Sequence, residues 1–166
     1  VQVIALAPTM PDLLDHWLTA LALATVVFAA LGTLVAVRLR ALAAWLVLLS
    51  AGALLVTPAQ ASAEVSAAAI YYLVQSTLAG AAFFLLAGVI AEQRGSAADH
   101  FTTRGASPAS WLKVAFLVAA TTAAGLPPFS GFVGKLMLLT TLRAVAAGPA
   151  IWVVLLCAGF VVMMLA

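Results

Sequence analysis

One stretch of this sequence places an ionisable side chain directly after residues that interrupt a helix. It reads GLPPFSGFVGK and ends at Lys135, after which uncharged sequence continues to Leu142. Adjacent prolines remove two backbone donors and stop a helix, and glycines permit backbone angles that other residues avoid. The residues that form this predicted helix break are Gly125, Pro127, Pro128, Gly131 and Gly134. A titratable group beside such a break has the chemistry of a proton relay.

Two interpretations of Lys135 follow from its surroundings. A lysine at mid-membrane costs about 2.5–3.5 kcal/mol to insert, and residues that remain there are usually functional. Burial disfavours the charged ammonium, so such a lysine can lose and regain a proton. Alternatively, Lys135 lies one turn inside a helix and extends its ammonium to the lipid headgroups. The neighbouring Pro-Pro break favours the functional interpretation, because broken helices recur at ion sites in transporters.

A second polar cluster, Gln75-Ser76-Thr77, lies near the middle of the charge-free run 65–91. Its functional interpretation is a hydrated patch that passes a proton or contacts a cation. The alternative is hydrogen bonding between helices, worth about 0.6 kcal/mol per contact. Arg40 is either a loop residue that sets topology or a helical residue that reaches inward. An arginine is effectively always protonated, so it would influence a neighbour's charge rather than relay protons.

The composition requires a membrane around these groups. Of the 166 residues, 66% are hydrophobic and 7% are charged, whereas a soluble domain carries roughly 25% charged residues. Charge-free runs of at least 21 residues cover 17–37, 41–63, 65–91, 114–134 and 144–166. About 20 apolar residues cross a hydrocarbon core, and continuous rather than alternating runs favour helices over barrel strands. The sequence therefore predicts an all-α, polytopic transmembrane helical bundle.

We expect about six spans, with one of the helices broken at the Pro-Pro-Phe-Ser-Gly segment. The expected helices lie near 17–37, 41–60, 66–91, 111–126, 130–146 and from 149 onward, and residues 1–10 are the tail of an earlier helix. Segment 92–110 is the expected aqueous loop. With six alternating spans, one side of the membrane holds Arg38, Arg40, Arg94, Arg104, Lys113 and Arg143, and the other holds Asp12, Asp15 and Glu64. The positive-inside rule assigns the arginine side to the cytoplasm of a multi-pass protein in the cell (inner) membrane.

Several classes of partner are not indicated by the sequence. No basic run interleaved with aromatic residues suggests a nucleic acid, and no cysteine or histidine spacing suggests a metal or another cofactor. The single cysteine, Cys157, lies in an apolar stretch and is interpreted as a small hydrophobic residue. The chain begins at Val1 and ends within an apolar run. We therefore expect residues 1–166 to be a single transmembrane domain that is a fragment of a longer polypeptide.

Three stretches resemble the antiporter-like membrane subunits shared by respiratory complex I and the multisubunit Mrp/Pha cation/proton antiporters. They are Leu39 to Gly52 (LRALAAWLVLLSAG), Tyr71 to Gly88 (YYLVQSTLAGAAFFLLAG) and Ala124 to Leu139 (AGLPPFSGFVGKLMLL). The third is the most specific and is similar to the family pattern AGIPPLSGFIGKFLLL. Within the family, the D-type component of the Mrp/Pha antiporters is the most similar. The family's subunits are about three times longer than this chain.

The resemblance implies roles for individual residues. Lys135 takes the position of the ionisable Lys or Glu in the family's second broken helix, which belongs to a chain of buried charges along the membrane midplane. Arg40 stands where a lysine is usual, and Gln75 and Ser76 stand where many members have a histidine pair. Gly80 stands where some members have another lysine. These departures leave the stretch with fewer titratable groups.

The resemblance implies a membrane subunit of a monovalent cation (Na⁺ or K⁺)/proton antiporter that contributes to the intramembrane proton path. Such a subunit is a secondary transporter component rather than an enzyme. Its partners would be other hydrophobic subunits, the transported ions and the lipid bilayer. Two alternatives stay open: a proton-pumping membrane-arm subunit of an NADH–quinone oxidoreductase, and an inactive truncated membrane fragment.

Overall fold

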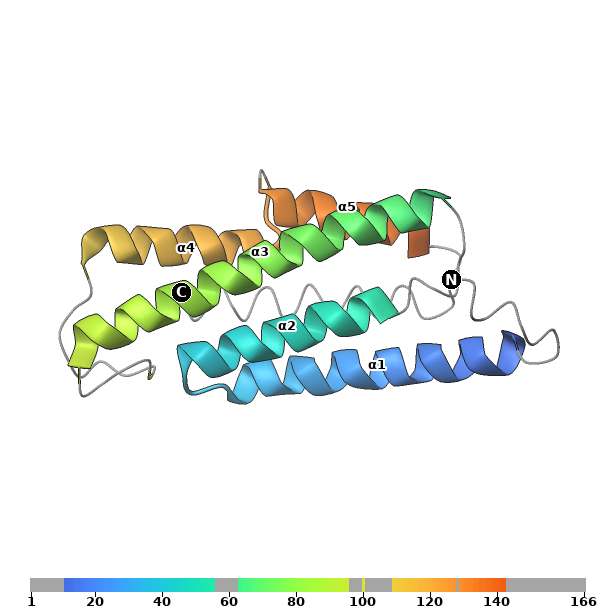
Figure 1. Ribbon diagram of the computed structural model, residues 1–166, viewed down its shortest axis with the longest axis horizontal. Helices are drawn as coiled ribbons and strands as arrows, with labels where there is room; N and C mark the ends of the chain where they lie inside the picture. Colours follow the sequence, from blue (N-terminus) through green and yellow to red (C-terminus); the bar gives the residue numbers. More distant parts are fainter. Residues whose placement is uncertain (1–10, 56–62, 96–99, 101–108, 128, 143–166) are drawn as a thin grey trace.

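A computed structural model describes residues 11–55, 63–95, 100, 109–127 and 129–142 of this chain (Figure 1). Its helices are α1 (Pro11–Val35), α2 (Leu39–Leu55), α3 (Ala63–Arg94), α4 (Ser110–Ala124) and α5 (Ser130–Leu142). Within the described ranges there are helices and no strand, which confirms the all-α class predicted from the continuous apolar runs.

The described helix ends lie within three residues of the predicted ends, apart from the start of α1 and the ends of α2 and α5, which coincide with the limits of the described residues. The prediction placed the start of α1 at residue 17, where the charge-free run begins. The helix begins at Pro11 instead, because it includes the charged and polar residues Asp12, Asp15 and His16. Proline suits the first helical position, where its missing N–H has no helical partner. Several predicted features lie outside the described residues: Cys157, the tail at 1–10, the helix from 149 and the ends predicted over 56–60 and 143–146.

Helix α3 lies between two groups of helices (Figure 1). On one side it packs against α2, which itself pairs with α1, and on the other side it packs against α4 and α5. Two helices, over Trp17–Val35 and Ala63–Arg94, are long and apolar enough to cross a membrane by themselves. Large apolar side chains stay exposed along the bundle, among them Phe28 and Leu85 at 61% and 72%. In lipid, such an apolar outer surface has no need of polar cover.

The α1–α2 interface is a close, apolar contact between helices. A Cβ atom at Gly32 would overlap the indole of Trp45, and one at Gly52 would lie 2.8 Å from a methyl of Val26. Trp45 also meets Phe28 edge to face, with ring centroids 5.3 Å apart. Small residues of this kind let helices approach closely in membranes.

Two apolar clusters occupy different parts of the bundle. One joins α1, α2, α3 and α5 and consists of Ala22, Val26, Ala29, Leu49, Ala53, Ala68, Tyr72 and Leu138. The other joins α2, α3 and α4 and is centred on Phe83 and Phe116, whose rings meet edge to face at 5.7 Å. Along α3, Tyr72 belongs to the first cluster and Phe83 to the second. The intervening turns of α3 therefore face a region that neither cluster fills.

Helices α4 and α5 follow one another along the length of α3 instead of lying side by side (Figure 1). Helix α4 contains 15 residues, or about 22 Å of helix, and so falls short of the roughly 30 Å hydrocarbon core; the described part of α5 contains 13 residues. The described parts thus differ from the two separate spans predicted at 111–126 and 130–146. Arg143 was predicted to lie on the same side of the membrane as the other arginines because 111–126 and 130–146 were counted as two crossings. Arg143 itself lies outside the described residues.

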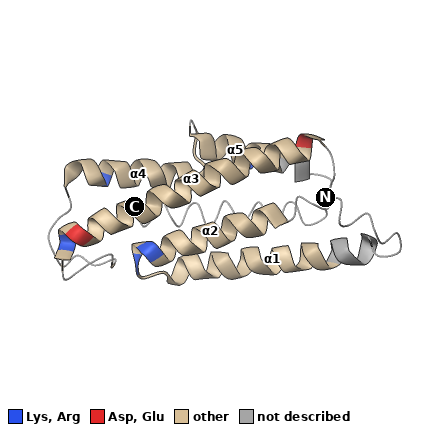
Figure 2. Cartoon of the chain, viewed as in Figure 1, with Lys and Arg blue, Asp and Glu red and all other residues tan. Residues whose placement is uncertain are grey.

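Apart from Lys135, the charged side chains that the structure describes lie near helix ends (Figure 2). Arg38 and Arg40 lie at the start of α2, Glu92 and Arg94 at the end of α3, Lys113 near the start of α4 and Glu64 at the start of α3. Of the predicted loop 92–110, residues 96–99 and 101–108 lie outside the described part. An Nη atom of Arg94 donates to the carbonyl of His100 at 2.7 Å, and Gln93 accepts from the amide of Ala109 at 3.0 Å.

Candidate functional site

The end of α4 is closed by a glycine in the left-handed conformation. Gly125 has φ 77° and ψ 43°, which glycine adopts without the steric cost that a Cβ atom brings. Its amide donates to the carbonyl of Thr122 at 3.2 Å, and the amide of Leu126 donates to the carbonyl of Thr121 at 3.2 Å. This pair of bonds is a Schellman motif, a common way to satisfy the carbonyls at a helix C-terminus.

The other two carbonyls at the end of α4 accept hydrogen bonds from Lys135. Its ammonium donates to Ala123 at 2.8 Å and to Ala124 at 2.7 Å. These are short, charge-assisted hydrogen bonds, and a cation is favoured at the negative end of the helix dipole. The Lys135 side chain is 6% exposed and points away from the surface, so it does not take the headgroup-directed position of the alternative interpretation.

Glycines make this approach of α5 to α4 possible. A Cβ at Gly125 would lie 2.7 Å from Cδ of Lys135 and 3.1 Å from its Nζ. A Cβ at Gly131 would overlap the carbonyl oxygen of Thr122, and one at Gly134 would lie 3.3 Å from the ring of Tyr72. Pro127 lies exposed in the turn between the helices, and Pro128 lies outside the described residues. The predicted break residues that are described therefore either form the turn or allow the close approach of α5 to α4 and α3, and Gly125 also makes room for Lys135.

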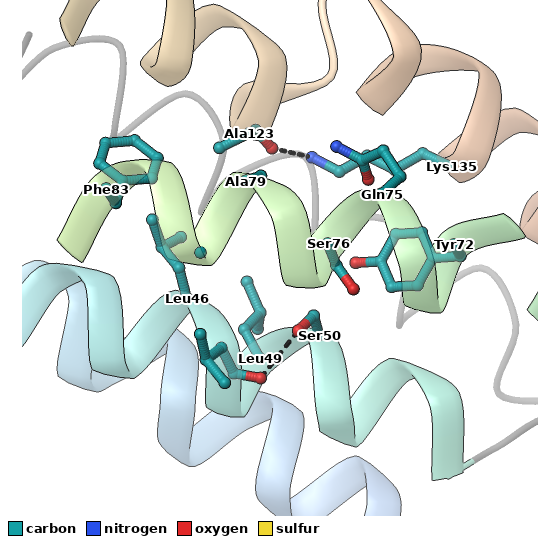
Figure 3. Close-up of a pocket in the computed structure, with 12 residues that line it drawn as sticks. Leu46, Leu49, Ser50, Tyr72, Gln75, Ser76, Ala79, Phe83, Ala123 and Lys135 are labelled. Atoms are coloured by element: carbon teal, nitrogen blue, oxygen red, sulfur yellow. Dashed lines mark hydrogen bonds between the residues drawn. The ribbon is translucent and has the colours of Figure 1, made fainter. Parts of the chain in front are cut away.

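Lys135 borders a cavity of about 40 Å³ between α2, α3, α4 and α5 (Figure 3). We name it the lysine cavity; its polar lining residues are Ser50, Tyr72, Gln75, Ser76 and Lys135. The Figure 3 view shows the Lys135 side chain extending toward Ala123, with Gln75 beside it. No Asp or Glu is among the described residues that line it. A space of this size exceeds the roughly 10–15 Å³ that one water needs.

A second, larger hollow of about 720 Å³ lies on the outer side of α3, between α3 and α4. We name it the open groove, and its lining is mainly apolar, with Val74, Leu78 and Val118 among its residues. Gln75 and Ala79 line both the open groove and the lysine cavity. Gln75 thus lies between the lysine cavity and the open groove.

The remaining predicted site residues lie in different places. Ser76 lines the lysine cavity and donates to the carbonyl of Leu73 at 3.2 Å. Thr77 is exposed, donates to the same carbonyl at 2.7 Å and does not line the cavity. Arg40 is the second residue of α2, at the charged end of the bundle, with an Nη atom 3.9 Å from where a Cβ at Gly88 would lie. The structure therefore brings Lys135, Gln75 and Ser76 together, but not Thr77 or Arg40.

Two cavity residues were missed from the sequence. Tyr72 lies three and four residues before Gln75 and Ser76, so helical periodicity puts it on the same face of α3. That spacing was a usable signal. Ser50 is on α2 and donates to the carbonyl of Val47 at 2.8 Å, and no local pattern linked it to α3 or α5. The carbonyls of Ala123 and Ala124 carry no side-chain signal at all.

Comparison with known proteins gives one family match over nearly the whole chain. Residues 1–163 match the model described as "NADH:quinone oxidoreductase/Mrp antiporter, TM". The chain is 31% identical to the D component of a probable K(+)/H(+) antiporter of Rhizobium meliloti (strain 1021), over 77% of this chain and 27% of that protein. It is 33% identical to the D component of the Na(+)/H(+) antiporter of Bacillus subtilis (strain 168), over 72% of this chain and 24% of that protein. The chain spans about a quarter of the length of these relatives.

Proposed function

Because this chain belongs to the NADH:quinone oxidoreductase/Mrp antiporter family of membrane proteins, as its sequence predicted, we propose that it is part of a cation/proton antiporter subunit. The subunit would exchange Na⁺ or K⁺ for protons within a multisubunit complex. The names of the two relatives, both D components of Na⁺/H⁺ or K⁺/H⁺ antiporters, support this proposal. So does the membrane-embedded, all-α character of the chain.

The buried ammonium of Lys135 is the observation that carries the proposal. It lies at the break between α4 and α5, and it borders the lysine cavity, whose lining includes four further polar side chains among apolar ones. Figure 1 places this break near the middle of the bundle's length. Ionisable groups held at this depth mark ion pathways and proton relays. Lys135 would accept and release the transported proton, while Gln75 and Ser76 would supply hydrogen-bonding groups along its path. We assign Arg40 and Thr77 to the same path only as sequence-based predictions.

The proposed membrane arrangement follows from how the helices lie against one another (Figure 1). Helices α1 and α3 are long enough to cross, α2 would cross beside them, and α4 with α5 would form a single broken span. The Schellman turn and Lys135 would satisfy the backbone at the break, as irregular backbone at membrane depth requires. The end with Arg38, Arg40, Arg94 and Lys113, including the 92–110 loop, would face the cytoplasm, and the membrane would be the cell (inner) membrane. Other hydrophobic subunits would cover part of the exposed apolar surface.

The test is cation-dependent collapse of a respiration-generated ΔpH in everted vesicles that hold the complete parent complex. We expect added Na⁺ or K⁺ to collapse ΔpH with Lys135 present and not with Lys135→Ala. The matched control is Lys113→Ala, which removes the same charge from an exposed position at the start of α4. Unchanged exchange in Lys135→Ala would refute the role of Lys135. Absence of any cation effect in the unaltered complex would refute the antiporter and favour the inactive fragment.

A second candidate is a proton-pumping membrane-arm subunit of an NADH–quinone oxidoreductase, which the matched family also includes. In that case the redox chemistry would take place in partner subunits. Purification of the parent complex separates the two candidates. Co-purifying iron–sulfur and flavin subunits, with ΔpH formation driven by NADH and insensitive to added cation, would favour the respiratory complex.

A further inference from the structure

Gly125 leaves open the space through which the Lys135 side chain reaches the end of α4. A Cβ atom at position 125 would lie 2.7 Å from Cδ, 3.2 Å from Cε and 3.1 Å from Nζ of Lys135. Carbon atoms in optimal contact are about 3.5–4.0 Å apart, so a Cβ here would force the lysine side chain to move. The contact involves the three outermost atoms of that side chain, including the ammonium nitrogen. A methyl group at position 125 would therefore change where the positive charge lies.

The conformation of Gly125 also decides which carbonyls Lys135 can reach. With φ 77° and ψ 43°, Gly125 turns the chain out of α4, and the two bonds of the Schellman motif occupy two of the last four carbonyls of the helix. The carbonyls of Ala123 and Ala124 are left, and both accept from the ammonium of Lys135. One residue thus sets the position of the acceptors through its backbone and leaves the lysine side chain room to reach them.

A second glycine allows these two roles to be separated. Gly95 is also left-handed, with φ 54°, and follows directly after the end of α3 at Arg94. Apart from its chain neighbours, no described residue would place an atom within 4 Å of a Cβ at this position. A left-handed backbone disfavours any residue with a Cβ, at Gly95 as at Gly125. The two glycines therefore share a backbone requirement, and Gly125 is the one of the two that contacts Lys135.

The packing of α5 gives Lys135 little freedom to yield to a larger neighbour. Helix α5 lies close to α4 at Gly131 and close to α3 at Gly134, so the backbone of Lys135 cannot retreat without breaking those contacts. A displaced side chain would instead turn toward the lysine cavity, where Gln75 lies beside it (Figure 3). That movement would break both bonds to the carbonyls of α4, which are short and charge-assisted.

We propose that Gly125 is the positioning residue of Lys135: by lacking a side chain, it holds the ammonium at the carbonyls of α4, where the exchange reaction requires it. This inference rests on the proposed function, in which Lys135 carries the transported proton, and it names a second residue on which that step depends. Gly125 touches neither the proton nor the cation and acts through the location of Lys135. If Gly125 served only to end α4, the cost of replacing it would not depend on the residue at position 135.

The experiment is a double-mutant cycle in the complete parent complex, with the thermal midpoint of the assembled complex as the measurement. Gly125→Ala is introduced into the unaltered complex, into Lys135→Met and into Lys135→Ala. Methionine keeps an unbranched stem but no ammonium, and alanine removes the side chain beyond Cβ. Gly95→Ala in the same three backgrounds is the matched control for a left-handed glycine.

We expect Gly125→Ala to lower the midpoint strongly in the unaltered complex and in Lys135→Met, and less in Lys135→Ala, where the stem that meets the new Cβ is gone. Gly95→Ala should lower the midpoint equally in all three backgrounds. If Gly125→Ala alone prevents assembly, the amount of assembled complex replaces the midpoint, and recovery in Gly125→Ala/Lys135→Ala is the expected result. An effect of Gly125→Ala that is the same in every background would show that Gly125 only ends α4, and would overturn the proposal.

Cation-dependent collapse of ΔpH is the second measurement, and it separates positioning from stability. Per assembled complex, Gly125→Ala should lose most of the exchange, whereas Gly95→Ala should keep it. Exchange in Gly125→Ala that matches Gly95→Ala would also overturn the proposal. If exchange depends on Lys135 but the cycle shows no coupling, Gly125 is not the positioning residue and the antiporter stands. If no cation collapses ΔpH in the unaltered complex, the antiporter itself is wrong, whatever the midpoints show.

Discussion

The α1–α2 interface and the α4–α5 junction both bring helices together through glycine, but different groups fill the space. At α1–α2, Gly32 receives the indole of Trp45 and the contact is apolar. At the junction, Gly125 receives the stem and ammonium of Lys135. The same residue type therefore serves close apolar packing in one place and access of a charge to backbone oxygens in the other.

The two regions also differ in how they satisfy buried polar groups. Thr33 is fully buried near the α1–α2 interface and donates to the carbonyl of Ala30 within its own helix at 2.7 Å. The carbonyls of Ala123 and Ala124 depend on a donor from another helix. A bond made within one helix survives small movements between helices, whereas a bond between helices does not. We therefore expect changes at α1–α2 to alter stability alone, and changes at the junction to alter stability and ion exchange together.

The largest effect is expected from Gly131→Ala. Its new Cβ would overlap the backbone carbonyl of Thr122, and no side-chain rotation can relieve a clash with backbone. We expect a loss of about 3 kcal/mol or more, at the upper end of overpacking costs, and little assembled complex in the membrane. Gly88→Ala is the control, because its Cβ would have only an Arg40 Nη atom near it, at 3.9 Å. Equal assembly of the two variants would contradict the close contact between α4 and α5.

The next effect is expected from Lys135→Met, which keeps most of the side-chain volume and removes both hydrogen bonds to α4. Leaving buried acceptors without donors costs about 1–3 kcal/mol, so the thermal midpoint of the complex should fall and cation-dependent ΔpH collapse should be lost. Thr33→Val is the comparison in the apolar interface. It should lower stability by about 1 kcal/mol and leave exchange per assembled complex unchanged. Loss of exchange in Thr33→Val would remove the contrast between the two regions.

A smaller effect is expected from Gly32→Ala, which tests the apolar interface directly. The added Cβ would overlap the half-buried indole of Trp45, which must shift and so alter its edge-to-face contact with Phe28. We expect a loss of about 1–2 kcal/mol in stability, since a side chain can yield where backbone cannot. Exchange per assembled complex, and its dependence on pH, should match the unaltered protein. A changed pH dependence would show that this interface is coupled to Lys135.

Much of the fold followed from the sequence because lipid imposes a simple rule. Uncharged runs of sufficient length must be helical, which predicted the described helices with small errors at most ends. The relation between α4 and α5 did not follow. The run 114–134 contains no charge, so a charge-based criterion does not divide it. The adjacent prolines predicted the break, but they cannot say whether the chain reverses or continues after it. The direction of α5 after the break depends on contacts between helices: Gly131 allows α5 to pack closely against α4, and Gly134 allows it to pack closely against α3.

The candidate site was only partly predictable, because the sequence reveals polar side chains but not which of them meet. Lys135 was predicted because a charged residue within an apolar membrane segment is usually functional. Gln75 and Ser76 were found from their polarity, and Thr77 was grouped with them although helical geometry turns it outward. Arg40 could not be placed, since either interpretation fitted a residue at a helix end. The oxygens that contact Lys135 belong to alanine backbone, and only the three-dimensional arrangement reveals them.

The smallest effect is expected from Gln75→Leu, which tests whether the polarity of the lysine cavity matters beyond Lys135. Gln75 lies between the cavity and the open groove, and its replacement removes an amide while keeping similar bulk. We expect stability to change by less than about 1 kcal/mol and the exchange rate to fall several-fold, because a proton or cation would meet an apolar barrier. Thr77→Val is the matched control, two residues further along α3 and outside the cavity, and it should leave the rate unchanged. If both variants exchange at the same rate, the amide of Gln75 is not needed for exchange, and the functional region contracts to Lys135 and the end of α4.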